Sequence, residues 1–131
     1  METLTHLGWV FLGGGIGSAL RYGVGRAALA LAGPNLPIGT FVVNVAGCAA
    51  MGALAEWLAW RDTGIDASMK LFLTTGVLGG FTTFSAFALD AVGLWQRGAT
   101  LTAIAYAVGS VLISLAGFLA GMALARTLVA P

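Results

Sequence analysis

The chain has 131 residues, of which 59% are hydrophobic and only 8% are charged, and its formal net charge is +1. This composition excludes an ordinary soluble domain, and the near-neutral charge excludes the basic surface that binding to nucleic acid requires. A helix needs about 20 mostly apolar residues to cross a bilayer, and four such runs fill most of the chain. We therefore predict an all-α membrane protein, one domain over residues 1–131, with transmembrane helices at about 7–31, 38–60, 71–95 and 99–125.

The first run is rich in glycine and carries two arginines. Glu2 precedes the run and Arg21 and Arg26 interrupt it, which is not the pattern of a cleavable signal peptide. Arg21 has two interpretations: it supplies positive charge to a vestibule that gathers anions, or the span ends near Arg26 and the side chain reaches the interface. Small residues four apart favour close helix packing; they occur as the pairs Gly13/Gly17, Gly76/Gly80 and Gly117/Gly121.

The second run follows a breaker segment at 32–37 and contains an isolated polar residue, Asn44, with Thr40 one turn earlier. A polar group inside the membrane is unfavourable without a partner, so Asn44 is a candidate functional residue. Cys48 is the only cysteine, which excludes an intrachain disulfide, and its place in the span indicates a packing role. Glu56, like Asp90 in the third run, lies nearer the end of its run, where a structural or vestibular role is expected. No Cys/His cluster has the spacing of a metal site.

The third run contains the segment LGGFTTFSAF at 78–87. Gly79 and Gly80 weaken a helix, and the β-branched Thr82 and Thr83 carry hydroxyls that can replace backbone partners. We therefore predict that the third helix is broken near the middle of the membrane. Non-helical backbone persists at that depth only when it is buried in protein or lines a cavity, and its freed carbonyls can coordinate a cation.

Aromatic and hydroxyl side chains follow the predicted break. Phe84 and Phe87 lie on one helical face, and the positive edges of their rings can hold an anion weakly enough for it to leave again; the alternative is simple packing. In the fourth run, hydroxyl side chains recur every four residues, forming a stripe on one face of a helix without charge. They either bond helix carbonyls or line a polar pathway, and the regular register favours the pathway. The stripe consists of Thr102, Tyr106, Ser110 and Ser114.

Charge in the connecting segments gives little preference for one orientation. An even number of spans places the basic residues Arg61, Lys70 and Arg126 on one side of the membrane and Arg26 and Arg97 on the other. Three against two is almost no bias under the positive-inside rule. Such a chain can insert both ways, and we predict a dual-topology homodimer in which two antiparallel copies are related by a two-fold axis in the membrane plane.

Three segments together resemble the CrcB/Fluc family of fluoride channels. They are the glycine-rich segment 13–22, the GTFVVNVAG segment at 39–47 and the pattern GGFTTFSAF at 79–87, and their order and spacing span the whole chain. Two positions depart from the family pattern: Ala86 stands where a small hydroxyl residue is common, and Asp90 stands where glutamate is expected.

The resemblance implies a passive fluoride channel rather than an enzyme, multi-pass in the plasma or inner membrane, with two separate pores in an antiparallel homodimer. Arg21 would lie in the vestibule, and the backbone carbonyls of Gly79 and Thr82 would hold a central structural Na⁺. The partners are then fluoride, a second copy of the chain and the lipid bilayer. The implied pore residues are Asn44, Thr83, Phe84, Ser85, Phe87, Tyr106, Ser110 and Ser114.

Two other classes have the same size. A small drug–proton antiporter needs a carboxylate deep in its first span to exchange protons for a cationic substrate, and residues 7–31 contain no Asp or Glu. A non-transporting assembly subunit would leave both the predicted break and the hydroxyl stripe without a purpose.

Overall fold

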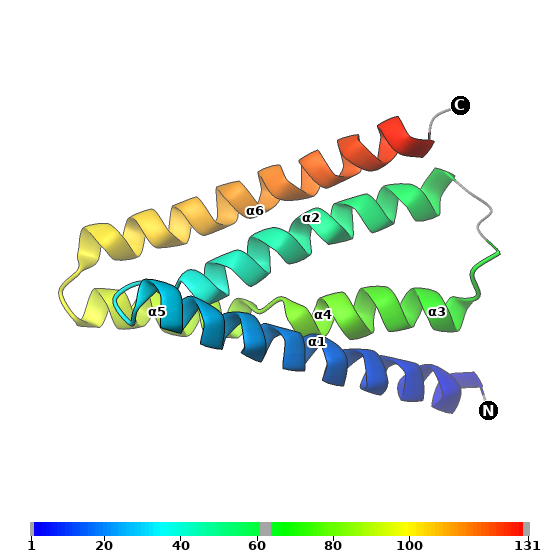
Figure 1. The fold of residues 1–131 in the computed structure, drawn as a ribbon, viewed down its shortest axis with the longest axis horizontal. Coiled ribbons are helices and arrows are strands. Elements are labelled where there is room, and N and C mark those ends of the chain that lie inside the picture. The colour runs from blue at the N-terminus through cyan, green and yellow to red at the C-terminus, as the bar shows by residue number, and fades with distance from the viewer. Residues whose placement is uncertain (1, 61–63, 130–131) are drawn as a thin grey trace.

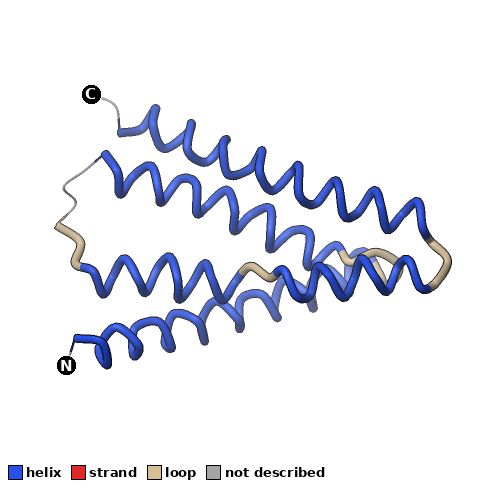
Figure 2. Tube along the Cα trace, turned by 180° about the vertical axis from the view of Figure 1, so that it is seen from behind, coloured by secondary structure: helices blue, strands red, loops and turns tan. Residues whose placement is uncertain are grey.

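The computed structural model describes residues 2–60 and 64–129, and these form helices joined by short connections, with no strand among them. The helices run side by side, and the two termini lie at the same end of the molecule (Figures 1 and 2). In chain order they are α1 (Glu2–Ala32), α2 (Ile38–Trp60), α3 (Ala67–Leu71), the π-helical segment η1 (Phe72–Leu78), α4 (Gly79–Phe81), α5 (Phe84–Gln96) and α6 (Thr100–Val129).

Within the described residues, three helical segments are long and apolar enough to cross a membrane: Ile38–Ala59, Ala67–Gln96 and Thr100–Leu128. They match the second, third and fourth predicted spans, with the third beginning four residues earlier than expected. The first predicted span forms the 31-residue helix α1, but α1 does not belong to that apolar set. Its many glycines, together with Arg21 and Arg26, lower its mean hydropathy, so a fourth crossing by α1 stays a prediction.

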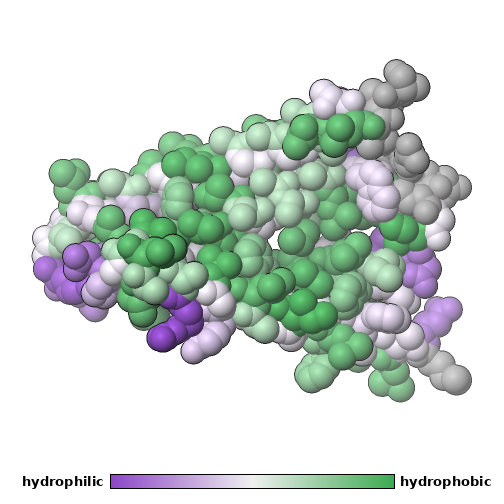
Figure 3. All heavy atoms as spheres, viewed as in Figure 1, coloured by the Kyte–Doolittle hydropathy of each residue, from purple (hydrophilic) through white to green (hydrophobic). Residues whose placement is uncertain are grey.

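The surface between the helix ends is apolar. Figure 3 shows hydrophobic side chains over most of one face, with hydrophilic residues gathered toward its ends. Large side chains on α6 such as Leu112, Leu119 and Leu128 are 61–76% exposed. A continuous apolar surface of this kind is unfavourable in water and is expected of a protein surrounded by lipid or by another chain.

Glycines bring the helix backbones into direct contact, as their spacing predicted. A Cβ atom on Gly13 of α1 would lie 2.9 Å from the Cα of Gly76, and one on Gly80 would lie 2.6 Å from the carbonyl oxygen of Gly14. In α6, a Cβ atom on Gly117 would lie 3.3 Å from the carbonyl oxygen of Val45 in α2. Close packing of α1 with the η1–α4 segment and of α6 with α2 is therefore confirmed.

The third helix is broken, but not at the glycines. Gly79 has helical angles (φ −64°, ψ −37°) and begins α4, whereas Thr82 and Thr83 are extended (ψ 161° and 121°). The break thus lies at Thr82–Thr83, near the middle of the apolar segment Ala67–Gln96. The predicted break of the third helix is therefore confirmed at the two threonines, whereas Gly79 and Gly80 stay helical and Gly80 packs closely against α1.

A tight turn lies at one end of the bundle and an ion pair at the other. The turn between α5 and α6 is a Schellman motif: Gly98, with φ +81°, donates to Trp95, and Ala99 donates to Leu94. At the opposite end, Glu56 is 4% exposed and accepts a 2.8 Å ion-paired hydrogen bond from Arg126 of α6. The structural role expected of Glu56 agrees with this contact.

The charges that enter the topology argument lie toward the helix ends. Arg26 and Arg97 are exposed, as is Lys70, while Arg61 lies outside the described residues. The structure holds one copy of the chain, and the antiparallel homodimer stays a prediction.

Candidate functional site

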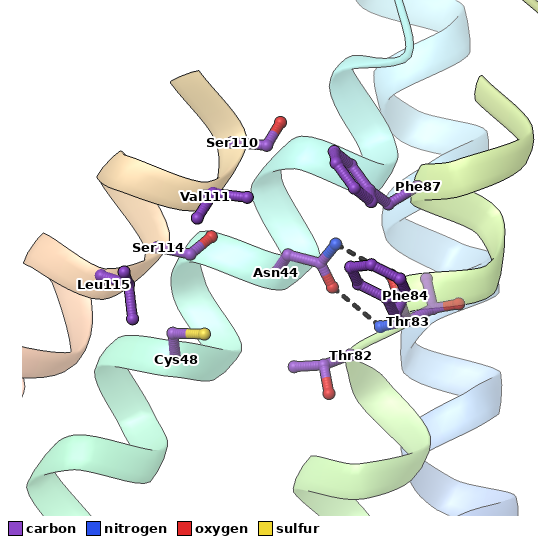
Figure 4. A pocket seen from close by; sticks show the side chains of 10 residues that line it. All are labelled: Asn44, Cys48, Thr82, Thr83, Phe84, Phe87, Ser110, Val111, Ser114 and Leu115. Atoms are coloured by element: carbon purple, nitrogen blue, oxygen red, sulfur yellow. Dashed lines mark hydrogen bonds between the residues drawn. The ribbon is translucent and has the colours of Figure 1, made fainter. Parts of the chain in front are cut away.

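A single side chain holds the break in place. Asn44 of α2 donates from Nδ2 to the carbonyl of Thr83 (2.9 Å), and its Oδ1 accepts from the amide of Thr83 (2.7 Å). Figure 4 shows the two bonds side by side. The amide group of Asn44 therefore supplies both partners that a regular helix would have given Thr83. This explains why an isolated asparagine is tolerated in an apolar span.

Thr83 also begins the next helix. Its hydroxyl accepts from the amide of Ala86 (3.2 Å) and lies 3.2 Å from the hydroxyl of Ser85, and the residue is only 8% exposed. This is the arrangement of an N-cap, in which a side-chain oxygen satisfies a free amide of the first turn. The N-terminus of α5 carries a positive partial charge and so favours an anion nearby.

The carbonyls on the other side of the break lose helical partners. In a continuous α-helix the amide of Thr83 would donate to the carbonyl of Gly79, but here it donates to Asn44. The carbonyl of Thr82 has a long 3.5 Å contact with Nη1 of Arg21. Arg21 lies well inside α1, which continues to Ala32, and faces the break. The helix therefore continues past Arg26, and the two interpretations of Arg21, a vestibule charge or an interfacial side chain, both stay predictions.

A cavity of about 340 Å³ lies beside the break (Figure 4). It is bounded by α2, by the break with the start of α5, and by α6. None of its lining side chains is acidic or basic. The lining consists of Asn44, Cys48, Thr82, Thr83, Phe84, Phe87, Ser110, Val111, Ser114 and Leu115.

Two hydroxyls in this cavity are buried without a partner. Ser110 is 4% exposed and Ser114 is 9% exposed, and neither Oγ atom has a hydrogen-bond partner in the described part of the chain. The alternative that the stripe bonds helix carbonyls therefore does not hold for these two residues. A buried hydroxyl without a partner is unfavourable by about 1–3 kcal/mol, so a polar occupant of the cavity would be stabilised by them.

The aromatic side chains form a tilted row from the cavity toward one end of the bundle. The ring centroids of Phe84 and Phe87 are 5.3 Å apart, and those of Phe87 and Tyr106 are 5.6 Å apart. Phe84 is 77% exposed, so one side of its ring is open. The hydroxyl of Tyr106 donates to Asp90 over 3.5 Å.

A second cavity, of about 400 Å³, lies at the end where α1, α2 and α5 meet. Its lining includes the polar residues Thr40, Asp90 and Arg97. Because Asp90 contacts Tyr106 and Tyr106 contacts Phe87, the two cavities are joined by a continuous line of side-chain contacts.

Most predicted site residues come together. Thr82 and six of the eight implied pore residues line the first cavity: Asn44, Thr83, Phe84, Phe87, Ser110 and Ser114. Ser85 and Tyr106 do not line it and contact residues that do, while Gly79 lies outside the cavity and Arg21 approaches the break from α1. The sequence analysis missed Cys48 as a lining residue, although its place one turn after Asn44 was a usable signal.

The fold and the site define a small helical membrane protein with a hydrogen-bonding cavity between its helices and a break in one of them. Residues 8–122 match the family described as CrcB-like protein, Camphor Resistance (CrcB), and the chain belongs to this family. Its members are ion channels and not enzymes.

Relatives are similar over almost their whole length. The chain is 54% identical over 121 residues to a protein of Paracoccus denitrificans, covering 92% of this chain and 94% of that protein. It is 50% identical over 117 residues to a protein of Methylobacterium sp. strain 4-46, covering 89% and 93%. It is 48% identical over 125 residues to a protein of Agrobacterium fabrum, covering 95% and 99%. Each of the three is named fluoride-specific ion channel FluC. The resemblance stated from the sequence is confirmed.

Proposed function

We propose that the protein is a fluoride-selective channel that lets fluoride leave the cell passively and so protects it. The observation that carries this proposal is the pair of buried, unpartnered hydroxyls of Ser110 and Ser114 in an uncharged cavity beside the break. Membership of the CrcB family and the names of the relatives support fluoride as the ion.

The lining suits a small anion that must bind and leave again. Hydroxyl groups replace part of the hydration shell of fluoride on the α6 side, and the positive edges of the rings of Phe84 and Phe87 replace part of it on the other. Neither wall carries a fixed positive charge that would trap the ion. The N-terminus of α5 adds a favourable partial charge. The edges of this route would be formed by Thr83, Ser85 and Tyr106.

The entrance is proposed to be electropositive. Arg97 lines the second cavity, and Arg21 faces the break from α1. Guanidinium groups beside an opening raise the local concentration of anions. Asp90 also lines the second cavity but is occupied by the hydroxyl of Tyr106, and fluoride would move past Tyr106 to the row of phenylalanines.

The working unit is proposed to be an antiparallel homodimer with one pore per chain, inserted in the plasma or inner membrane in both orientations. The open side of Phe84 and the apolar outer face are what a second copy would cover. The similar numbers of basic residues toward the two ends favour no single orientation.

A structural Na⁺ on the dimer axis is part of the proposal. The carbonyl of Gly79 has lost its helical donor and that of Thr82 has only a long contact with Arg21, so these oxygens fit the donor set of a hard cation. The bound ion would supply positive charge that satisfies the carbonyls and favours an anion nearby. The residues of this chain set the break through Asn44, whether or not the ion is bound.

The test is fluoride efflux from liposomes containing the purified protein, followed with a fluoride electrode. Efflux of fluoride with little efflux of chloride is the expected result. A matched control is Val111→Ile, which changes an apolar lining residue by one methyl group and leaves every hydrogen-bonding group in place. Liposomes that retain fluoride would contradict the proposal, and proton-coupled efflux of organic cations would favour an antiporter.

A further inference from the structure

The cavity contains a group that the proposed fluoride route does not use. Cys48 is the only cysteine of the chain, is half-buried and lines the first cavity. It lies one helical turn after Asn44, so both side chains lie on the same face of α2 (Figure 4). The packing role expected from its place in an apolar span therefore does not describe it fully.

The cavity also has free oxygen ligands and no competing carboxylate. The hydroxyls of Ser110 and Ser114 are at least nine-tenths buried, have no partner in the described residues and line the same cavity as the thiol. A cavity without acidic groups does not attract hard divalent cations, whereas a thiolate strongly selects soft ones. The lining of the cavity therefore favours soft, thiophilic metal ions over hard ones.

We propose that Cys48 is a binding site for a single soft, thiophilic metal cation, and that its occupation closes the anion route. With Hg²⁺, the sulfur loses its proton to water and forms one S–Hg bond, which leaves a bound metal with one positive charge and involves no oxidation or reduction. The thiolate is the ligand, as in other cysteine–metal sites. Closure of the route rests on the proposed function, whereas binding of the metal does not.

Closure follows from charge as well as from bulk. Conduction requires that an ion bind weakly enough to leave. A fixed positive charge beside Ser114 and Asn44 would hold an anion much more tightly than neutral hydroxyls do. The bound metal also occupies part of a cavity of about 340 Å³.

The experiment combines two readouts on the purified protein. Mass spectrometry of the intact chain after exposure to mercury(II) nitrate in chloride-free buffer counts the bound metal. Fluoride efflux from liposomes is compared before and after the mercury salt and again after excess dithiothreitol. The variants are Cys48→Ser, Cys48→Ala and Cys48→Ser combined with Thr127→Cys, which moves the only thiol to an exposed position at the end of α6. Each variant is judged by the ratio of its own rates with and without mercury.

We expect one mercury per wild-type chain, near-complete and dithiothreitol-reversible loss of efflux, and no effect of mercury on either Cys48 variant. The relocated thiol should bind mercury without loss of efflux. The proposal is overturned if the wild-type chain takes up no mercury, if it takes up mercury at Cys48 and keeps its efflux rate, or if the Cys48 variants lose efflux equally. Absence of efflux before mercury would instead contradict the proposed function, and the mass measurement would still decide the metal site.

Discussion

The substitution Gly47→Ala tests whether the break is held in position by the packing of α2 against it. Gly47 is buried, and a Cβ atom there would collide with Cγ2 of Thr82 and lie 3.2 Å from Cδ1 of Phe81. Relief requires either that Thr82 change its rotamer, which breaks the 3.1 Å hydrogen bond from its hydroxyl to a backbone carbonyl of the preceding turn, or that the extended segment move away from α2. That movement pulls Thr83 from its 2.7 and 2.9 Å hydrogen bonds with Asn44.

The free-energy cost of Gly47→Ala follows from these contacts. Forcing a methyl group into a filled site costs about 1–3 kcal/mol, and two hydrogen bonds of about 1 kcal/mol each oppose the movement that would relieve it. A penalty of about 2 kcal/mol shifts the balance between the held and the displaced break by roughly thirtyfold. We therefore expect a severe loss of fluoride efflux from liposomes, with the variant eluting from gel filtration at the volume of the wild type.

A second-site change separates this mechanism from general damage. Thr82→Ser removes the Cγ2 atom that the new methyl group meets and keeps the hydroxyl and the carbonyl, so the double variant should recover much of the lost efflux. Gly8→Ala is the matched control, because nothing lies within 4 Å of a Cβ atom there. Normal efflux in Gly47→Ala, or a double variant no better than the single one, would refute the reasoning.

Four further outcomes are expected. Phe84→Ile and Phe87→Ile keep apolar bulk but remove the ring edge, so liposome efflux should fall sharply in each while gel filtration matches the wild type; normal efflux would mean that the rings only pack. Asn44→Asp should abolish efflux, because the carboxylate repels an anion and cannot donate to the carbonyl of Thr83; an unchanged rate would argue against both roles. A single reporter cysteine between α2 and α3, without Cys48, should be labelled from both faces of intact cells, whereas labelling from one face would exclude dual topology. Replacing sodium by N-methylglucamine throughout purification should weaken efflux or dimer stability, and identical behaviour in both would argue against the structural ion.

The polar candidates could be found from the sequence because each is conspicuous where it stands. An asparagine, a run of hydroxyls and a threonine pair in apolar segments all need partners, and the structure places Asn44, Thr83, Ser110 and Ser114 around one cavity. The regular four-residue spacing on α6 predicted that the side chains of Ser110 and Ser114 lie on the same face of that helix. No structural knowledge was needed for that inference.

The site of the break could not be found in the same way. Local propensity favoured unwinding at Gly79 and Gly80, but the decisive contact is made by Asn44, 39 residues earlier in the chain. Likewise, the pattern placed Arg21 inside the predicted helix at 7–31, but nothing local indicated that its side chain would face the break. Such features depend on which helices become neighbours, and single-sequence patterns do not contain that information.

The tight turn at Gly98 has a consequence for how the chain enters a bilayer. As a 13-residue helix, α5 is only about 20 Å long, which is shorter than the roughly 30 Å hydrocarbon core. The Schellman turn joins it directly to the 30-residue α6, which is long enough to cross unaided. Because the whole segment Ala67–Gln96 is long enough to cross, we expect the tight turn to favour its entry into the lipid together with α6 as one helical hairpin, with the half-helix that carries Phe84 and Phe87 next to the turn.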